Sequence, residues 1–298
     1  MRNTKKIIIS GALGQNGIIL SKLLVKKKFS VYGLINKKRK NKIKSVIYKK
    51  INFNNLREIE NILKKINPSH FIHFGSENPN FNSKKNFFNK NYRFTKNIIT
   101  AIIKTDKNIN FIFPNSSQIF KKKKKVNEQS SIFISDSYTK FRVKIFNYMM
   151  SLKKNNFKFS NLILFNHDSI FRNKNFLLPR IVKSIVKKDL KFIKKIYKEN
   201  LIGDFSHADD ICNAIYLLIK KKECFDNIII SSNLKTNVND IIDFLIKKYT
   251  KQVKIDIKPD INKNYIIGDN SLAKRKLNWK LKKNIFDAAD EIMKNYVK

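Results

Sequence analysis

The sequence is short of cysteine, glycine, proline and acidic residues, and these shortages exclude several classes of protein. Two cysteines, Cys212 and Cys224, are too few for a disulfide framework or a cysteine-based metal site. Seven glycines and five prolines leave no flexible or stiff linker. No apolar stretch approaches the roughly 18 residues of a membrane span, and the short apolar run after the N-terminus predicts a strand, with no signal peptide. We therefore expect a cytoplasmic protein without a metal and without a membrane partner.

The shortage of acidic residues gives the chain a large positive charge. Asp and Glu number 22 against 64 Lys and Arg, a formal charge of +42. Such a charge is typical of proteins that bind nucleic acid or anionic membranes. The lysines, however, are spread along the chain together with Asn, Ile, Phe and Tyr, all of which have AT-rich codons, and no nucleic-acid-binding motif accompanies them. We attribute the charge to AT bias of the genome, expect no nucleic-acid partner, and expect the positive field to attract a phosphate-bearing substrate.

Apolar residues make up 42% of the chain, enough for a globular core. In the first half, short apolar runs alternate with stretches at helical spacing. Strands are expected at 7–9, 30–35, 46–51, 71–74 and 111–113, and helices at 15–27, 56–66, 86–104 and 137–154. This alternation predicts an α/β fold, a doubly wound parallel Rossmann sheet.

The second half of the chain is less regular. A strand is expected at 160–165, helices at 176–188 and 207–221, a last core strand at 228–230, and three short helices after residue 236. We predict a Rossmann domain over residues 1–170 and a smaller α/β substrate-binding part over 171–298. The two interleave, with residues near 200–231 returning to the Rossmann core.

Residues 11–17, Gly-Ala-Leu-Gly-Gln-Asn-Gly, lie directly between the first strand and the first helix. The turn uses three of the seven glycines, Gly11, Gly14 and Gly17. Glycines there permit a tight turn and let backbone N–H groups approach a pyrophosphate at the helix N-terminus. We expect this turn, with Gln15 and Asn16, to bind a dinucleotide cofactor; the alternative is a purely structural turn.

The end of the second strand helps to choose the cofactor. Enzymes that use NAD place a carboxylate there for the ribose hydroxyls. Residues 34–39 are Leu-Ile-Asn-Lys-Lys-Arg, without an acid, and the cations suit a 2′-phosphate. The segment favours NADP, with Lys37 as a contact, and NAD is the alternative. Asn52, after the third strand, is a candidate contact to the adenine.

Several segments resemble one family of enzymes. They are the glycine turn, Ser116-Ser117 after the fifth strand, Tyr138 at a helix start, Leu-Phe-Asn-His-Asp-Ser at 164–169, Gly-Asp-Phe-Ser-His-Ala-Asp-Asp at 203–210, and the tail from Gly268-Asp269 to Trp279. Together they resemble the extended short-chain dehydrogenases/reductases, the NAD-dependent epimerases and dehydratases, and within them the GDP-mannose 4,6-dehydratases. The resemblance spans nearly the whole chain.

The resemblance implies an enzyme that moves a hydride at C4 of a nucleotide sugar, GDP-linked in this family, and forms a homo-oligomer. It implies Ser116 as the hydroxyl that positions the C4 oxygen and Tyr138 as the base, assisted by a cation one helical turn later. It also implies that Asn166 contacts the sugar or diphosphate, and Arg180 a phosphate.

Three positions depart from the family pattern. Gln118 stands where the family has the Glu that removes the C5 proton, and an amide cannot act as a base. Arg142 stands where the family has Lys, and Gly203 replaces a phosphate-contacting Arg. Three interpretations stay open: a 4-reductase or 4-epimerase, a dehydratase that takes its base from Glu128 or Asp136, or a drifted copy with little activity. A non-catalytic cofactor-binding protein is the alternative from another class.

Two histidines have structural explanations. His73 lies in an apolar strand and is expected in the core. Ser206-His207-Ala208-Asp209 has the pattern of a capping box, which predicts that Ser206 starts a helix and that His207 is structural.

Overall fold

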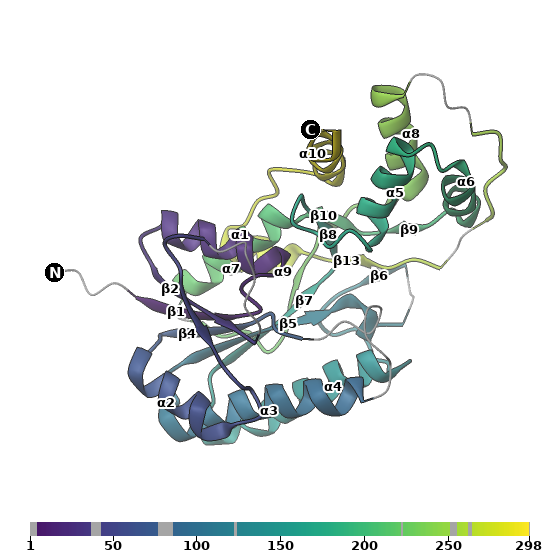
Figure 1. Ribbon diagram of the computed structural model, residues 1–298. Helices are drawn as coiled ribbons and strands as arrows, with labels where there is room; N and C mark the ends of the chain where they lie inside the picture. The colour runs from purple at the N-terminus through teal and green to yellow at the C-terminus, as the bar shows by residue number, and fades with distance from the viewer. Residues whose placement is uncertain are drawn as a thin grey trace. The chain divides into compact units, whose positions relative to one another are not determined.

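Seven strands form the central sheet of the computed structural model (Figure 1). They lie in the order β11-β7-β5-β4-β1-β2-β3. Their bounds are β1 Lys6–Ser10, β2 Ser30–Ile35, β3 Ile47–Lys50, β4 His70–His73, β5 Asn110–Ser116, β7 Phe159–Leu164 and β11 Ile228–Ile230. The predicted doubly wound parallel sheet is confirmed. The chain runs outward from β1 to β3 and then returns to β4, which pairs with β1 in parallel, so the β1–β4 junction is the topological switch point where such sheets bind ligands.

The structure describes residues 5–36, 43–76, 86–121, 124–221, 223–250, 255–261 and 264–297. The chain divides into two units. Unit 1 comprises Met1–Lys121, Ser131–Ile163 and Ile215–Ile228, and unit 2 comprises Lys122–Ser130, Leu164–Ala214 and Ile229–Lys298. The sequence-based boundary at residue 170 stays a prediction.

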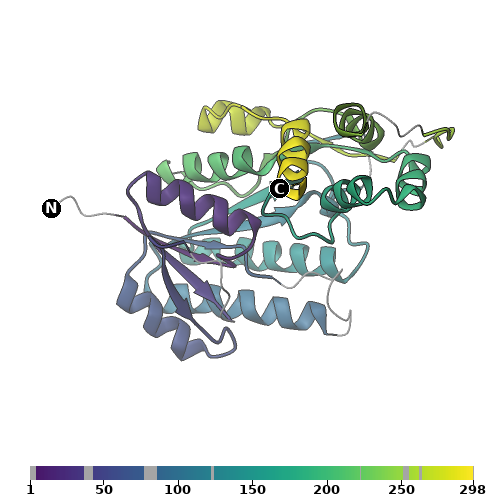
Figure 2. The same cartoon turned by 45° about the horizontal axis from the view of Figure 1, so that its top comes forward.

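Four helices of unit 1 cover the two faces of the sheet. Their bounds are α1 Gln15–Lys26, α2 Leu56–Ile66, α3 Phe87–Thr105 and α4 Ser137–Ser151. Helices α2, α3 and α4 lie on one face and α1 on the other, as Figure 2 shows from a second side. Because successive strand residues point to opposite faces, Phe111 and Phe113 both reach the α3–α4 side, where they pack with Phe71 and Phe141 in one buried cluster.

Unit 2 has its own core, which joins four helices. They are α5 Leu177–Val186, α6 Leu190–Glu199, α8 Val238–Tyr249 and α10 Ile285–Val297. Unit 2 also has three pairs of short strands: β8 (Asn166–Asp168) with β10 (Phe205–His207), β9 (Ile202–Gly203) with β12 (Thr236–Asn237), and β6 (Lys125–Val126) with β13 (Ile267–Gly268). Helix α9 spans Ser271–Leu277, and α7 (Ala208–Lys220) crosses the boundary between the units. Within the described ranges, every helix is too short or too polar to cross a bilayer.

Several elements differ from the sequence-based expectation. Helix α6 was not predicted; Asp189 caps it by accepting the N–H of Phe192. Strand β5 continues past Phe113 through Pro114 to Ser116. Its pairing with β4 ends at Ile112, so Pro114 removes no hydrogen bond from that ladder.

Candidate active site

The glycine turn after β1 is built for close backbone approach. Gly11 has φ +68°, which favours glycine, and a Cβ there would lie 2.7 Å from the backbone nitrogen of Gly75. A Cβ on Gly17 would lie 2.4 Å from the carbonyl oxygen of Gly11. At Gly14, the N-cap of α1, an added Cβ would meet only the carbonyl oxygen of Gly11, at 3.3 Å. Gly11 and Gly17 therefore shape the turn, while Gly14 leaves space at the N-terminus of α1.

A chain of neutral hydrogen bonds joins this turn to the one after β4. Thr95 Oγ1 donates its hydrogen to the carbonyl of Asn91, so it must accept from His73 Nε2 at 3.0 Å. His73 Nδ1 then accepts from Ser10 Oγ at 2.6 Å, and Ser10 Oγ accepts the N–H of Gly75 at 3.3 Å. When the imidazole is neutral, each donor in this series of hydrogen bonds has an acceptor. Burial, with a contribution from the charge of Arg142, lowers the pKa of His73 to about 3.

The core role predicted for His73 is confirmed, since the side chain is buried. Gly75 and Ser10 were missed as parts of the turn. Gly75 lies directly after a predicted strand, in a sequence with only seven glycines, and this position could have identified it as part of the turn.

The other predicted cofactor contacts lie in or near unit 1. Gln15 and Asn16 form the first residues of α1. Asn52 lines a pocket of about 490 Å³ together with the rings of Phe53 and Phe94. Its side chain accepts the N–H of Asn54. Lys37 lies outside the described residues.

The serine pair ends β5 and begins a single 3₁₀ turn, η1 (Ser117–Ile119). Ser116 Oγ accepts the N–H of Gln118 at 3.3 Å, and the N–H of Ser116 bonds to Asn115 Oδ1 at 2.8 Å. These bonds fix the hydroxyl oxygen and leave its hydrogen for an acceptor. The side chain of Gln118 is exposed.

Tyr138 lies in the first turn of α4, which a capping box starts. Asp136 accepts the N–H of Thr139 at 2.7 Å, and Thr139 Oγ1 accepts the N–H of Asp136 at 3.0 Å. Arg142 follows one turn later, with its guanidinium carbon 5.0 Å from the centroid of the Tyr138 ring. Its Nη1 donates to the carbonyl of Pro114 at 2.6 Å, two residues before Ser116. The structure thus brings Tyr138, Arg142 and the end of β5 together.

Arg142 is a buried cation with unusual surroundings. The residue is 9% exposed, and its guanidinium also lies over the rings of Phe113 and Phe141, at 5.3 and 5.1 Å. Its Nε has no hydrogen-bond partner, and among the described residues no carboxylate forms an ion pair with it. A buried charge without a counter-ion is costly and is a recognised mark of a functional site.

Both substitute bases suggested by the sequence have structural partners. Glu128 Oε1 accepts the backbone N–H of Ile229 at 3.0 Å. Asp136 Oδ1 accepts from both the N–H and the hydroxyl of Thr139, at 2.7 and 2.9 Å. Either carboxylate would have to give up these bonds before it reached a substrate.

The predicted substrate contacts lie in unit 2. Asn166 begins β8 and is exposed, although the next three residues are buried. Arg180, in α5, is also exposed, and its guanidinium carbon lies 4.4 Å from the ring centroid of Phe192 in α6. Near Asn166, Asp168 forms an ion pair with Arg172 at 3.0 Å. Burial raises the pKa of Asp168 and lowers that of His167 to about 4.

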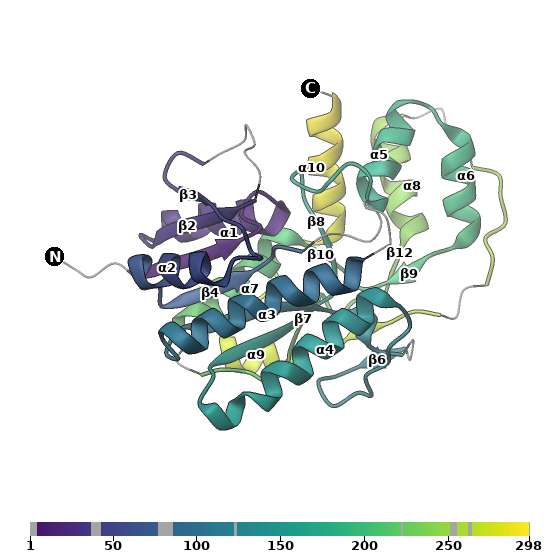
Figure 3. The ribbon, with the colours of Figure 1, turned by 60° about the horizontal axis from the view of Figure 1, so that its bottom comes forward.

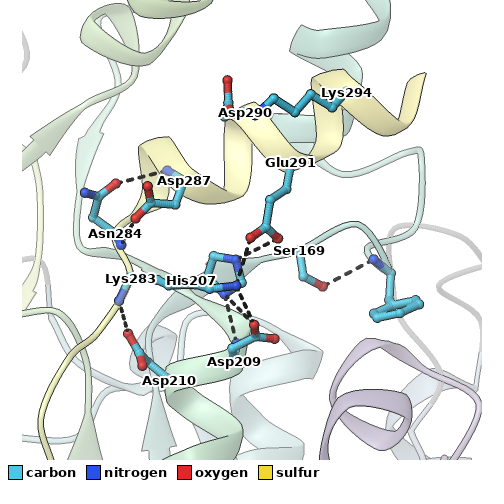
Figure 4. A network of polar contacts seen from close by, with 11 residues as sticks. Ser169, His207, Asp209, Asp210, Lys283, Asn284, Asp287, Asp290, Glu291 and Lys294 are labelled. Atoms are coloured by element: carbon cyan, nitrogen blue, oxygen red, sulfur yellow. Dashed lines mark hydrogen bonds and ion pairs between the residues drawn. The ribbon is translucent and has the colours of Figure 1, made fainter. Parts of the chain in front are cut away.

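The prediction that Ser206 caps α7 is wrong. His207 Nδ1 accepts the N–H of Asp209 at 3.1 Å (Figure 4). Ser206 Oγ has no hydrogen-bond partner among the described residues. Because Nδ1 accepts, Nε2 carries the hydrogen and donates to Glu291, 3.1 Å away. Lys283 Nζ joins the same group by binding Asp209 and Glu291, both at 2.8 Å. The imidazole is longer than a serine side chain and reaches the helix N–H first.

The described residues contain no group of three or more His, Cys, Asp or Glu side chains placed to hold a metal ion. Cys212 is buried in α7 and Cys224 is exposed, and neither forms a disulfide.

Comparison with known proteins places the chain among sugar-nucleotide enzymes. A family model described as GDP-mannose 4,6 dehydratase matches residues 8–292. A curated protein from Drosophila melanogaster, named GDP-mannose 4,6 dehydratase, is 22% identical over 97% of this chain and 85% of its own length.

Two solved structures show the same fold. A UDP-glucose 4-epimerase from Thermotoga maritima, crystallised with UDP-glucose, superimposes with a TM-score of 0.83 at 15% identity, over 98% of both chains. A dTDP-glucose 4,6-dehydratase from Bacillus anthracis, in complex with NAD, gives 0.83 at 13% identity, over 99% of this chain and 97% of that one.

Proposed function

The chain belongs to the GDP-mannose 4,6-dehydratase family, and from that premise we propose that it transfers a hydride at C4 of a GDP-linked sugar with a bound nicotinamide dinucleotide. The family is one of nucleotide-sugar dehydratases and epimerases, so the protein is an enzyme of that kind. The observation that carries the proposal is the buried, unpaired charge of Arg142 beside the ring of Tyr138.

The residues of unit 1 fit a dinucleotide. The space at Gly14 admits a pyrophosphate to the N-terminus of α1, whose first turn has no acidic residue to repel it. Solved structures of this fold contain NAD. For this chain we propose NADP, supported by the absence of an acid at residues 34–39 and by Lys37, with NAD as the alternative. Gln15, Asn16 and Asn52 are proposed as further contacts.

The bound nicotinamide supplies a hydride acceptor or donor for the sugar carbon. The side chains of the protein transfer the proton and position the sugar. Tyr138 takes the proton from O4 when the alcohol is oxidised and returns it when the ketone is reduced. The fixed positive charge of Arg142 favours negative charge on the Tyr138 oxygen, and the hydroxyl of Ser116 bonds to O4. From unit 2, Asn166 and Arg180 are proposed to contact the sugar and the diphosphate.

The geometry favours a 4-reductase or 4-epimerase over a dehydratase. Dehydration needs a base for the C5 proton, and Gln118 cannot supply one. Glu128 and Asp136, the substitutes, are held by Ile229 and Thr139. Oxidation and reduction at C4 need only the proton relay of Tyr138. The dehydratase stays the second candidate because the family model and the curated relatives carry that name. A homo-oligomer is also proposed, from the family alone.

Two incubations test the proposal. The protein with NADPH and the GDP-linked 4-keto-6-deoxy sugar should give the 4-hydroxy product, detected by NMR, and with NADP⁺ and GDP-mannose it should release no water. Formation of a 4-keto-6-deoxy product from GDP-mannose would select the dehydratase instead. Tyr138→Phe should abolish turnover and keep cofactor affinity. No cofactor binding in a fluorescence titration would reject the enzyme altogether.

Gln118→Glu restores the missing carboxylate at its family position. If the amide is what blocks elimination, this variant should gain measurable dehydration of GDP-mannose. Gln118→Asn is the matched control, because it keeps an amide, and should gain none.

A further inference from the structure

A short turn joins α5 to α6 (Figure 3). It exposes aliphatic side chains next to a concentration of lysines. Val186 ends α5 and is 40% exposed, and Leu190 begins α6 and is 38% exposed. All six residues from 186 to 191 are exposed. We call residues 186–191 the hairpin tip. The inner side of the same hairpin supplies Ile185, Ile193 and Ile196 to the core of unit 2, so the exposed pair is not needed to close that core.

Lysines surround the two aliphatic side chains. Those exposed at the tip and along α6 are Lys187, Lys188, Lys191, Lys194, Lys195 and Lys198. Two acidic residues belong to this segment: Asp189 caps α6 through the N–H of Phe192, and Glu199 stands at the other end of that helix. Two more lie beside α6, since Asp243 accepts from the Tyr197 hydroxyl at 3.1 Å and the N–H of Asp260 bonds to the carbonyl of Lys198. The six lysines outnumber these four carboxylates. The ion pairs of unit 2 that the described residues form lie elsewhere, on Lys125, Arg172, Lys248, Lys283 and Lys294.

One of these lysines occupies a backbone position that disfavours it. Lys188 has φ +54°, in the left-handed region. Of the eight described non-glycine residues with positive φ, six are Asn and two are Lys. Asn tolerates this conformation better and has codons as AT-rich as those of Lys. Codon bias alone therefore does not account for a lysine at this position of the tip.

We infer that the hairpin tip docks onto an anionic lipid surface, with Val186 and Leu190 entering the headgroup region and the lysines binding the lipid phosphates. An interfacial site of this kind combines apolar side chains with cations and needs no spanning helix. It therefore departs from the sequence-based expectation of no membrane partner, which rested on the lack of a spanning segment. The tip is held in shape by backbone bonds, Asp189 N–H to Ser184 O at 2.8 Å and Lys188 N–H to Ile185 O at 3.1 Å.

A lipid fits the tip better than a nucleic acid does. Single-stranded nucleic acids are bound by stacking on exposed aromatic rings, and the exposed side chains at the tip are aliphatic. The nearest ring, Phe192, lies under the guanidinium of Arg180. The inference does not depend on the proposed function. The hairpin tip is separate from the proposed substrate contact Arg180, because Val186 lies six residues later, about 9 Å further along α5.

Co-sedimentation with vesicles tests the inference. The protein should bind vesicles with about 30% phosphatidylglycerol in phosphatidylcholine and not pure phosphatidylcholine. Two double variants, Val186→Asp with Leu190→Asp and Lys187→Glu with Lys188→Glu, should each lower binding about tenfold or more. The matched control is Lys64→Glu with Lys65→Glu, an equally exposed adjacent pair at the end of α2, which should lower it less than about twofold.

Three results would overturn the inference. They are no binding of wild type to the anionic vesicles, as great a loss of binding in the control pair as in the tip pair, and wild-type binding by the aspartate variant. If the lysine variant lost binding to a labelled oligonucleotide and the aspartate variant kept it, the surface would be one that binds nucleic acid instead. Lys188→Asn separates charge from folding, since it should raise the Tm while weakening vesicle binding.

Discussion

The buried polar networks of the two units differ in charge. In unit 1 they are neutral: Ser10, His73 and Thr95 form one chain, and the amides of Asn115 and Asn161 form another. In unit 2 they contain ions. The Asp204 carboxylate is 1% exposed and accepts four hydrogen bonds, from the N–H and hydroxyl of Ser232 and from the N–H groups of Asn233 and Gly268. Asp168 with Arg172 is a further example. Lys283, Asp209 and Glu291 form a partly exposed ionic group in the same unit.

The comparison singles out Arg142. Among the described residues of unit 1 it is a buried cation beside neutral networks, and its guanidinium has one backbone acceptor and three aromatic rings in place of a carboxylate. The buried charges of unit 2 are stabilised by the groups that bind them. We propose that the charge of Arg142 assists proton transfer by Tyr138.

The largest effect on stability is expected at Asp204. Asp204→Ala leaves four buried donors without an acceptor, which should lower the free energy of unfolding by about 3–5 kcal/mol. Asp226→Ala is the control, because its ion pair with Lys153 is half-exposed and should cost less than about 1 kcal/mol. Urea unfolding monitored by circular dichroism measures both. Equal losses in the free energy of unfolding would show that the buried carboxylate contributes no more to stability than the half-exposed ion pair, and would contradict this prediction.

Acidification should destabilise unit 1 more than unit 2. The pKa values of His70 and His73 fall to about 4 and about 3 in the folded protein, mainly through burial. Between pH 6.5 and 4 the unfolded chain binds protons on these side chains and the folded one does not, so stability is lost as pH falls, by about 2 kcal/mol for each histidine at pH 5.

In unit 2 the effect is partly offset. His167 behaves as His70 and His73 do, but burial raises the pKa values of Asp168 and Asp204, so these carboxyl groups take up protons more readily in the folded state. Hydrogen exchange at pH 7 and pH 5 should therefore show a greater loss of protection in β1 and β4 than in α8 and α10. A uniform loss, or a greater one in unit 2, would contradict this account.

The smallest effect is expected at Lys283. Burial opposes its charge, but the bonds to Asp209 and Glu291 raise the pKa of its ammonium group. All three side chains are more than a third exposed, so Lys283→Met should cost less than about 1 kcal/mol. The difference from wild type should vanish in about 1 M salt. A salt-independent loss would show that the group acts through packing.

Hydrophobic periodicity was enough to predict most of the fold. Ile7-Ile8-Ile9 is the apolar run of a buried strand, and Leu56–Ile66 has the periodicity of an amphipathic helix. Both elements lie where they were predicted. The short strand pairs of unit 2 were not predicted, because two or three residues have no readable period. Helix α6 was hidden by the same lysines that mark the hairpin tip.

The candidate site was predicted unevenly, for a physical reason. Gly11, Gly14 and Gly17 stand together in the sequence, so their geometry was foreseeable from spacing. The hydrogen bond from Arg142 to Pro114 joins residues 28 apart, and the bond from Ser10 to His73 joins residues 63 apart. Such contacts exist only after the sheet forms. The capping of α7 by His207 was missed because capping rules describe short side chains.

Arg142→Met, measured for stability and turnover together, tests the central claim most directly. Methionine fills similar apolar space without the unpaired charge, so the variant should be at least as stable as wild type. Turnover of the GDP-linked substrate should fall about 10²- to 10⁴-fold, because Tyr138 loses the charge that assists its proton transfer. Unchanged turnover, or a loss of stability with turnover per folded molecule preserved, would show that Arg142 serves the fold and would contradict the site proposed here.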